Sequence, residues 1–555
     1  MVKAANGLIR ILKAEGVPFI SLFPSCRVNN AAGEEGMPMF MMRDERFGVA
    51  VADAFSRVSN RKRFGVCTLQ GGINAAGLEF AAGAIMQAFE DSSPILCITD
   101  GVPLGETGTS HFHIDRVFST FTKWTAYVDE PRRVPELARR AFVHLKTGRP
   151  GPVLLQIPPN LGEYDETRYP YEPVETWRSQ ADPDNVKAVV KTLLAAKKPL
   201  IYAGEGVFYA DACAELLQFA ELAQMPVLTT LKGKSAFPDN HPLALGTRGE
   251  PADHFLNGCD VLFAVGSSIS PHRFSHAIPN AAEKTIIQLT VDTSDLNKNY
   301  TTKHALIGDA QLVLRQLIAE VAAQTGGGVK PKRELLDEIA SVKAVMREKY
   351  GPLLHSSDTP INPYRVYNDL MNTLDLKNSF VTGDSGSTRD QLSTVFEAQV
   401  PHGFMGWGNV STLGFSLAGA IAAKLAFPER QCVNVTGDAG VGYMLGNLEA
   451  AVRYNLGITT IHINNGGFAG YGPGFWGPGQ DPYTCKVSPA EVTNCAKAAE
   501  ALGLYAERVA DPREIVPALK RAFDENSRNR PAYLEFICSQ YPVWGVWAGM
   551  KAKGA

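Results

Sequence analysis

The sequence predicts an α/β protein built from three doubly wound, parallel-sheet domains. Short apolar runs of strand length alternate with longer helical stretches along the chain, and this order is typical of parallel sheets covered by helices. Most of the strand-like runs are apolar at successive positions, as expected for strands that are buried on both faces. The chain has 555 residues, which is enough for three or four domains of roughly 150 residues each.

The predicted elements begin with a helix that has apolar residues at positions 8, 9, 11 and 12, and with a strand at 19–23. Later strands are expected at 64–69, 95–99, 152–157, 200–203, 227–231, 261–265, 285–291, 380–382, 432–436, 458–463 and 532–537. Two linker-like segments interrupt the pattern: 161–185 is polar and rich in Pro, Tyr and Glu, and 325–332 has consecutive glycines before a charged helical stretch. These breaks predict domains at 1–165, 186–325 and 355–545.

Charge and cysteine usage exclude several classes of protein. With 54 basic and 57 acidic residues the net charge is −3, so there is no electrostatic footprint for nucleic acid or for a membrane surface. No apolar run reaches the roughly 18 residues that span a bilayer. The nine cysteines are scattered without a Cys-x-x-Cys pair, which indicates reduced thiols in a cytoplasmic protein. We expect a cytoplasmic protein with a small-molecule substrate, without a nucleic-acid or membrane partner.

The strongest chemical signal lies in the third predicted domain. The strand at 432–436 runs into Gly437, Asp438, Ala439 and Gly440, and the next strand ends in a pair of asparagines that includes Asn465. Glycines at a strand-to-helix turn let backbone N–H groups approach a phosphate. A carboxylate at such a turn needs a cation between it and the phosphate, and Mg²⁺ prefers oxygen ligands of this kind.

Either half of this pattern alone is usually an ordinary turn or loop. The spacing of 27 residues between Asp438 and Asn465 fits one helix and one strand, so both residues are expected at the same edge of a parallel sheet. The carboxyl edge of such a sheet is where ligands bind. The pair therefore predicts Mg²⁺ held jointly by the protein and a diphosphate.

These motifs resemble the diphosphate-binding region of thiamine-diphosphate-dependent enzymes of the acetolactate synthase, pyruvate decarboxylase and benzaldehyde lyase superfamily. The resemblance covers nearly the whole chain in the order pyrimidine (PYR), central and diphosphate (PP) domain. It implies metal contacts from Asp438, from the side chain of Asn465 and from the backbone carbonyl of Gly467. The cofactor-binding residues that it implies are Ser387, Thr388, Ser411, Leu413, Gly437, Asp438, Ala439, Gly440, Asn465, Gly467 and Phe468.

Some of these assignments depart from the family pattern, and others have a simpler interpretation. In the segment 406–420, Leu413 resembles the apolar residue that props the cofactor into its bent form, and the backbone of Ser411 and Leu413 would bind the pyrimidine. The family more often has glycine at Ser411, and also at Ala439. The loop 383–388, with Ser387 and Thr388, resembles a further diphosphate contact, although a Ser/Gly turn needs no function.

The first domain supplies the predicted catalytic acid. Taken alone, Glu45 is a charge near a helix start, where the helix dipole favours it. The resemblance implies that Glu45 exchanges a proton with a ring nitrogen of the aminopyrimidine. His111 and His113 stand on a loop where relatives place polar residues that face the thiazolium, so either one is a candidate catalytic residue. A solvated or packed histidine is an equally good reading of both.

The remaining segments give weaker signals. The central domain has a Gly-x-Gly at Gly204 and Gly206 but lacks the Gly-x-His-Gly run of flavin-binding acetolactate synthases, so we expect no FAD. Aromatic residues cluster after Asn465 and again at Tyr541, Trp544 and Trp547. Those rings are expected either in ordinary packing or in an apolar lid over the substrate.

The resemblance implies an enzyme that uses thiamine diphosphate and Mg²⁺ to break or form carbon–carbon bonds in 2-oxo acids, aldehydes or acyloins. Carboligation, decarboxylation and acyloin cleavage share these motifs. A 2-hydroxyacyl-CoA lyase or oxalyl-CoA decarboxylase is the alternative within the class, and a catalytically idle cofactor-binding homologue is the alternative outside it. The resemblance also implies self-association into a dimer or tetramer, with Glu45 and Asp438 of different subunits serving one cofactor.

Overall fold

A computed structural model describes residues 1–60, 62–72, 75–107, 113–271, 275–467, 490–541 and 543–549 of the chain. The chain forms two compact units. Unit 1 contains Met1–Trp177, Gly408–Pro428 and Glu449–Tyr454, and unit 2 contains Arg178–Trp407, Glu429–Leu448 and Asn455–Ala555. The segment 408–428, which carries Ser411 and Leu413, thus packs in the same unit as Glu45.

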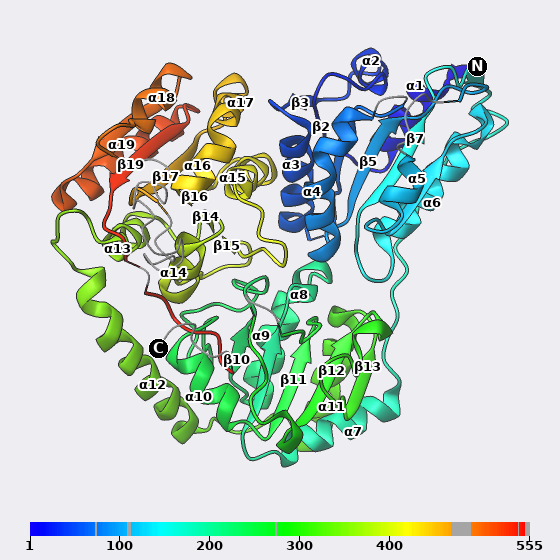
Figure 1. Cartoon of the computed structure of the whole chain (residues 1–555). Coiled ribbons are helices and arrows are strands. Elements are labelled where there is room, and N and C mark those ends of the chain that lie inside the picture. Colours follow the sequence, from blue (N-terminus) through cyan, green and yellow to red (C-terminus); the bar gives the residue numbers. More distant parts are fainter. Residues whose placement is uncertain are drawn as a thin grey trace, which may run out of the picture. The chain divides into compact units, whose positions relative to one another are not determined.

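Unit 1 is built on a six-stranded parallel sheet in the order β3-β2-β4-β5-β7-β6, with a small antiparallel pair β1-β8 (Figure 1). Its elements are β1 (Val2–Lys3), α1 (Ala4–Ala14), β2 (Ile20–Leu22), α2 (Val28–Glu34), β3 (Met39–Met41), α3 (Glu45–Val58), β4 (Gly65–Leu69), α4 (Ala76–Glu90), β5 (Ile95–Asp100), α5 (Ile114–Phe118), β6 (Trp124–Tyr127), α6 (Val134–Lys146), β7 (Val153–Ile157), β8 (Glu163–Tyr164), α15 (Phe415–Ala426) and α17 (Leu448–Arg453).

Helices cover both faces of this sheet, as the alternation of its side chains requires. Val66 on β4 belongs to an apolar cluster with α1 and α6, whereas the next residue, Cys67, belongs to a cluster with α3 and α4. On β5, Leu96 likewise belongs to the cluster with α1 and α6, and Cys97 to the cluster with α3 and α4. Successive side chains of a strand point to opposite faces, so a strand buried on both sides reads as a continuous apolar run.

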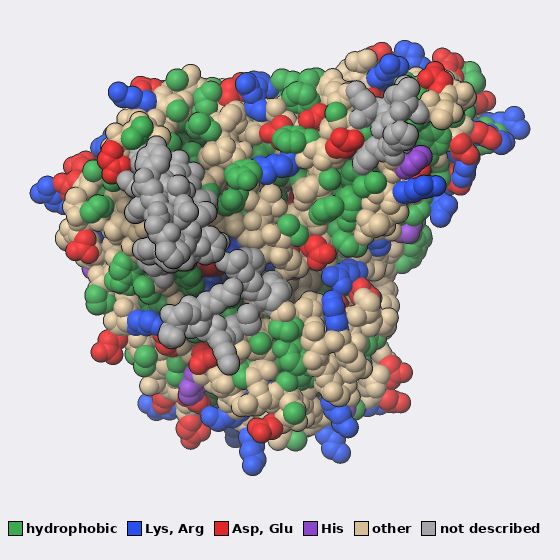
Figure 2. All heavy atoms as spheres, in the orientation of Figure 1, with side chains coloured by type: hydrophobic (Ala, Val, Ile, Leu, Met, Phe, Trp, Pro, Cys, Tyr) green, Lys and Arg blue, Asp and Glu red, His purple; other side chains and the backbone are tan. Residues whose placement is uncertain are grey.

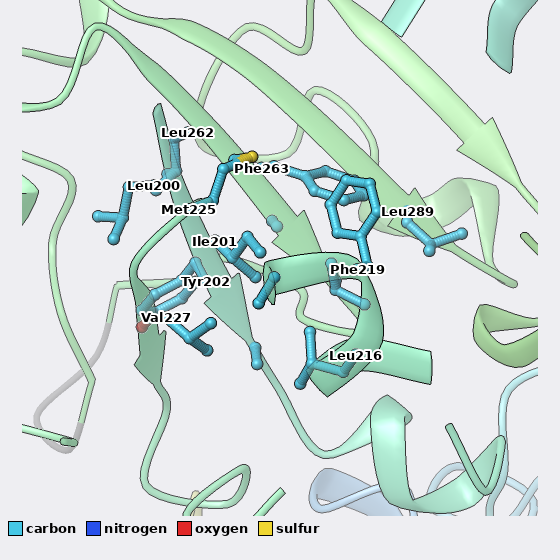
Figure 3. Close-up of a cluster of buried hydrophobic side chains, with 14 of the residues drawn as sticks. Leu200, Ile201, Tyr202, Leu216, Phe219, Met225, Val227, Leu262, Phe263 and Leu289 are labelled. Atoms are coloured by element: carbon cyan, nitrogen blue, oxygen red, sulfur yellow. The ribbon is translucent and has the colours of Figure 1, made fainter. Parts of the chain in front are cut away.

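Unit 2 contains two parallel sheets, and the first is the five-stranded sheet β10-β9-β11-β12-β13. Figure 3 shows its core, in which Phe219 of a helix packs toward Ile201 and Phe263 of two neighbouring strands. The elements of this region are α7 (Pro183–Ala195), β9 (Pro199–Ala203), α8 (Gly206–Tyr209), α9 (Cys213–Ala223), β10 (Val227–Thr229), α10 (Glu250–Gly258), β11 (Val261–Val265), β12 (Thr285–Thr290), β13 (His304–Ile307), α11 (Ala310–Thr325) and α12 (Arg333–Leu354).

The second sheet of unit 2 is six-stranded and parallel, in the order β15-β14-β16-β17-β19-β18. If the strands of each six-stranded sheet are numbered in chain order, with β2 as the first in unit 1 and β14 as the first here, both sheets have the order 2-1-3-4-6-5. Its elements are α13 (Pro363–Thr373), β14 (Ser379–Gly383), α14 (Ser387–Val395), β15 (Phe404–Met405), β16 (Gln431–Gly437), α16 (Asp438–Met444), β17 (Ile458–Asn464), α18 (Cys495–Ala501), β18 (Tyr505–Val509), α19 (Ile515–Ser527) and β19 (Ala532–Ile537). The predicted α/β class with three parallel sheets is confirmed.

The two faces of this last sheet differ in chemistry. Ile461 and Ile463 of β17 pack into an apolar cluster with α13 and α19. The alternate residues Thr460, His462 and Asn464 point to the other face and are also buried. Buried polar groups need hydrogen-bond partners, so β17 carries a polar network inside the domain.

The face of the protein in Figure 2 carries basic and acidic side chains interspersed with one another. Among the described residues, none of the helices combines the length and the apolar character needed to cross a membrane.

The C-terminal segment 543–549 is anchored on the central sheet region of unit 2. The Arg248 guanidinium lies 4.3 Å from the ring centre of Trp547 and donates to the backbone carbonyl of Gly545. The His276 ring accepts from the backbone N–H of Ala548 at 3.0 Å and donates to the carbonyl of Thr247 at 2.8 Å. Trp547 is buried in this packing, so of the two readings of the aromatic residues the structure favours packing for this one.

This anchor is expected to weaken as the pH falls. Burial lowers the pKa of His276, the Thr247 carbonyl raises it and the Arg248 charge lowers it, to about 4. The undocked ring would protonate near its ordinary pKa of about 6.5, so docking is fully stable above pH 6.5 and weakens as the pH falls toward 4. Hydrogen-exchange protection of peptides covering 543–549 should drop roughly 30-fold by pH 5, after correction for intrinsic rates. In the His276→Gln variant this pH dependence should disappear; an equally steep loss there would contradict the prediction.

Candidate functional site at the carboxyl edge of the parallel sheets

The predicted diphosphate site lies where the strand order of the third sheet reverses. In the order β15-β14-β16, the chain leaves β14 toward one side and returns on the other. Ligands of doubly wound sheets bind at such a switch point, outside the carboxyl ends of the strands. Asp384 follows β14 directly, and Asp438 is the first residue after β16. Both carboxylates therefore stand at the edge that the sequence predicted for a ligand.

Gly440 is required by the close packing at this edge. A Cβ atom there would lie 2.1 Å from Asp384 Oδ2 and 2.3 Å from the hydroxyl oxygen of Thr436. The Thr436 hydroxyl donates to Asp384 Oδ2 at 3.1 Å, and the backbone N–H of Ser385 donates to Oδ1 at 2.9 Å. Gly437, in contrast, has open space where its side chain would be, with only the Thr388 methyl group at 3.9 Å. Gly437, the residue that caps α16, is half-buried.

Hydrogen bonds link the three predicted metal ligands in the order Asp438, Asn465 and Gly467. Asp438 is buried, and its Oδ2 accepts from the backbone N–H of Asn465 at 3.2 Å. The side-chain oxygen of Asn465 lies 3.3 Å from the backbone nitrogen of Gly467. A carboxylate, an amide oxygen and a backbone carbonyl form an all-oxygen donor set, which suits Mg²⁺. The donor groups of these residues therefore fit a divalent cation such as Mg²⁺, which they would hold if it were bound.

A buried polar network lies beneath Asp438. His462 Nε2 is 3.2 Å from Asp438 Oδ1, and the Tyr533 hydroxyl is 2.9 Å from Nδ1 of the same ring. Burial lowers the pKa of His462, but the hydrogen bonds to Asp438 and Cys495 raise it more, to about 9. His462, Cys495 and Glu535 also bring ligand atoms within 4.8 Å of one another.

In unit 1, Glu45 occupies the first turn of α3. The preceding residue, Asp44, caps the helix by accepting from the backbone N–H of Phe47 at 2.7 Å. Glu45 is only 8 % exposed, and Ser25 donates to its Oε1 at 3.3 Å. A Cβ atom at Gly77 would lie 2.7 Å from the same oxygen. The carboxylate is thus enclosed by residues of its own unit.

The segment 408–414 is fastened to the same unit by its backbone. Asp91 accepts from the backbone N–H groups of Gly408 at 3.0 Å and Asn409 at 2.9 Å. The Gln87 side chain accepts from the backbone N–H of Thr412 at 3.1 Å. Ser411 has φ +67°, a left-handed conformation that costs a residue with a side chain about 1–2 kcal/mol. Glycine adopts this conformation without that cost.

Comparisons with known proteins find relatives that cover nearly the whole chain. Three profiles match the chain: "Thiamine pyrophosphate enzyme, N-terminal TPP binding domain" at 2–119, "central domain" at 186–317 and "C-terminal TPP binding domain" at 384–536. A probable acetolactate synthase large subunit of Methanocaldococcus jannaschii is 32 % identical over 97 % of this chain and 92 % of its own length. The chain belongs to the thiamine pyrophosphate enzyme family. A glyoxylate carboligase of Escherichia coli O157:H7 is 26 % identical over 94 % of this chain and 90 % of its own.

The acetolactate synthase isozyme 3 large subunit of Escherichia coli K12 is similar at the same level, 25 % identical over 96 % of this chain and 94 % of its own. As a thiamine pyrophosphate enzyme, the chain requires residues for both ends of the cofactor. The structure places the candidates for the diphosphate end in unit 2, and Glu45, Ser411 and Leu413 in unit 1.

The other predicted site residues of this thiamine pyrophosphate enzyme have varied surroundings. Ser387 is half-buried at the start of α14, and the Thr388 hydroxyl donates to the backbone carbonyl of Asp384 at 2.8 Å. Ala439 is half-buried in the first turn of α16, and Leu413 is half-buried. His113 is exposed at the residue before α5. His111 and Phe468 lie outside the described residues.

Close packing accounts for the Gly-x-Gly of the central sheet. A Cβ atom at Gly204 would lie 2.3 Å from the backbone oxygen of Gly266, and one at Gly206 would lie 2.7 Å from the Gly266 Cα. The loops after β9 and β11 therefore touch through their backbones. These glycines have a structural reason that needs no ligand.

Proposed function

We propose that this thiamine pyrophosphate enzyme is a carboligase that takes a 2-oxo acid as donor. The observation that carries the proposal is the pairing of Asp438 with Asn465 at the sheet's switch point, with Gly440 packed tightly behind them. Its relatives named acetolactate synthase and glyoxylate carboligase cover nearly the whole chain, which supports the choice of reaction class.

In this proposal, Asp438, the side chain of Asn465 and the carbonyl of Gly467 hold Mg²⁺ against the diphosphate. The first turn of α16, including Gly437, Ala439 and Gly440, and the loop with Ser387 and Thr388 would contact the phosphate oxygens. Phe468 follows the metal ligands in the chain and is assigned to the cofactor site with them. Helix starts with accessible N–H groups favour anions.

The bound cofactor supplies a carbon nucleophile for the donor carbonyl and a sink for the electrons released when carbon dioxide leaves. Glu45 holds or accepts the proton at the pyrimidine ring nitrogen, and the enclosure by Ser25 and Gly77 keeps its carboxylate in place. The backbone of Ser411 and Leu413 orients the pyrimidine, and the Leu413 side chain supports the bent form. His113 and His111 remain the candidates for polar groups that face the substrate.

The subunit arrangement is part of the proposal. A dimer or tetramer would form complete sites from Glu45 of one subunit and Asp438 of another. A cytoplasmic location is supported by the cysteines, because the eight that the structure describes are all free thiols and seven of them are buried.

The proposal is tested by turnover with thiamine diphosphate and Mg²⁺ on pyruvate, glyoxylate, benzoylformate, an acyloin and an acyl-CoA compound. We expect carbon dioxide release from a 2-oxo acid together with a new carbon–carbon bond in the product, identified by NMR. The Asp438→Asn variant should be inactive and serves as the control. Turnover of the acyl-CoA compound alone would favour the lyase or oxalyl-CoA decarboxylase alternative. Cofactor binding without any turnover would favour the idle homologue.

A further inference from the structure

We propose that His462, held by Tyr533, is a positioning residue that fixes the Asp438 carboxylate for its cation. The inference rests on the proposed function, in which Asp438 is a metal ligand. It concerns two residues for which the sequence motifs give no role. His462 lies on the polar face of β17, three residues before Asn465.

The strand register brings these groups together. Thr436 on β16 pairs with His462 on β17, so their side chains leave the sheet on the same face. Each of the two donates to an aspartate at the sheet edge: Thr436 to Asp384 Oδ2 at 3.1 Å, and His462 Nε2 to Asp438 Oδ1 at 3.2 Å. One pair of neighbouring side chains thus supports both carboxylates of the switch point.

The direction of the hydrogen bond follows from its partners. An ionised carboxylate can only accept, so His462 Nε2 must carry the hydrogen that points to Asp438. Nδ1 faces the Tyr533 hydroxyl at 2.9 Å. Both rings are buried, and the His462 side chain is fully inaccessible. Because both ring nitrogens have a hydrogen-bond partner, only one orientation of the ring makes both hydrogen bonds.

The hydrogen bonds to Asp438 also fix the orientation of its carboxylate group. Oδ1 accepts from His462, and Oδ2 accepts from the backbone N–H of Asn465 at 3.2 Å. Each carboxylate oxygen can accept two hydrogen bonds or ligands, and within the described part of the chain each of the two accepts one, which leaves a second position that a cation could take. Because Asp438 is buried, loss of the His462 donor removes the hydrogen bond to Oδ1 and leaves the carboxylate held only through Oδ2 by the Asn465 backbone.

His462 is also near Cys495 and Glu535, but the hydrogen bonds there favour a protein network over a second metal site. Glu535 accepts from the Asn464 side chain at 2.7 Å and from the backbone N–H of Ala496 at 3.0 Å. With both Glu535 oxygens and both His462 nitrogens engaged, the cluster has its hydrogen bonds within the protein.

Two substitutions at His462 separate the role toward Asp438 from a general packing role. The amide nitrogen of His462→Gln reaches the position of Nε2 and keeps the hydrogen bond to Asp438. The amide of His462→Asn reaches only the position of Nδ1 and keeps the contact with Tyr533. Tyr533→Phe leaves His462 in place but removes the group that orients its ring.

The probe is Mn²⁺ in the presence of thiamine diphosphate, with free Mn²⁺ measured by electron paramagnetic resonance. Loss of a partner that orients a metal ligand typically weakens binding 10–100-fold. We expect roughly that loss for His462→Asn, near wild-type affinity for His462→Gln and a smaller loss for Tyr533→Phe. Equal affinity in wild type, His462→Asn and Tyr533→Phe would overturn the inference, as would equal losses in the Gln and Asn variants. Absence of Mn²⁺ binding by the wild type would instead overturn the proposed function.

Discussion

Replacing Glu45 by glutamine is expected to lower kcat roughly 10²–10⁴-fold, the usual range for loss of a general acid–base group. Glutamine has the same shape and can still accept from Ser25, which donates to Glu45 Oε1 at 3.3 Å. The helix start is capped by Asp44 rather than by Glu45, so the fold should not change. The variant cannot exchange a proton with the pyrimidine. The fall in kcat should therefore report the loss of this proton exchange and not a change of fold.

The measurement is hydrogen–deuterium exchange at the thiazolium carbon of the bound cofactor, followed by quenching in acid and NMR. Exchange in Glu45→Gln should be slower than in wild type by a factor similar to the loss in kcat, while Mn²⁺ binding stays unchanged. Glu79→Gln is the matched control, because Glu79 lies in the first turn of the neighbouring helix α4 and is exposed. If wild type exchanges no faster than Glu45→Gln, the catalytic assignment of Glu45 is wrong.

The interior strands of all three sheets could be predicted from the sequence, because their residues are apolar on successive positions. The strands that were missed include β3, β6, β13, β15 and β18, each at the edge of its sheet. β15 is buried but has only two residues, too few to form a recognisable run. The other four strands have a neighbour on one side only and are mostly half-buried. The sequence of such a strand therefore need not form the continuous apolar run of an interior strand, and β18, which reads Tyr-Ala-Glu-Arg-Val, is an example.

The candidate metal ligands could also be predicted from the sequence, because they lie next to the ends of strands. The residues that support them could not be predicted, because they are far apart in the sequence and meet only in the folded chain. His462 contacts Tyr533 across 71 positions of the chain, and Gly408 contacts Asp91 across 317. The alternation of Thr460, His462 and Asn464 along β17 was the available signal for a polar face, although it does not identify the partners.

Sequence reasoning also left the aromatic C-terminus open between packing and a lid. The structure places Trp547 against Arg248 and His276. Both partners belong to the central sheet region. The aromatic composition of the C-terminal segment does not reveal these contacts, so the sequence could not decide between packing and a substrate lid. Amphipathic aromatic residues need partners for their edges and faces, and these are set by tertiary contacts.

The segment that carries Ser411 and Leu413 depends on a buried charge cluster. Arg57 on α3 donates to Asp53 at 2.7 Å and 2.9 Å and to Asp91 at 2.9 Å. The side chains of all three are almost inaccessible, with at most 3 % exposed. Asp91 also accepts from the backbone of Gly408 and Asn409. Arg57 therefore neutralises the carboxylate to which the segment 408–414 is tied.

Replacing Arg57 by methionine is expected to destabilise unit 1 by about 3–5 kcal/mol, because two buried carboxylates lose their cation. For a unit of this size the thermal midpoint should fall by roughly 6–20 °C, with hydrogen exchange increased in α3, α4 and residues 408–414. Arg139→Met on α6 is the matched control, because Arg139 is exposed and contacts the Pro170 carbonyl and the Tyr171 ring rather than a buried carboxylate. A shift in Arg57→Met no larger than in this control would show that Asp53 and Asp91 do not need the guanidinium. In the folded variant at low temperature, a weakened hold on residues 408–414 should lower the affinity for thiamine diphosphate more than that for Mn²⁺, because the proposed function assigns this segment to the pyrimidine end of the cofactor.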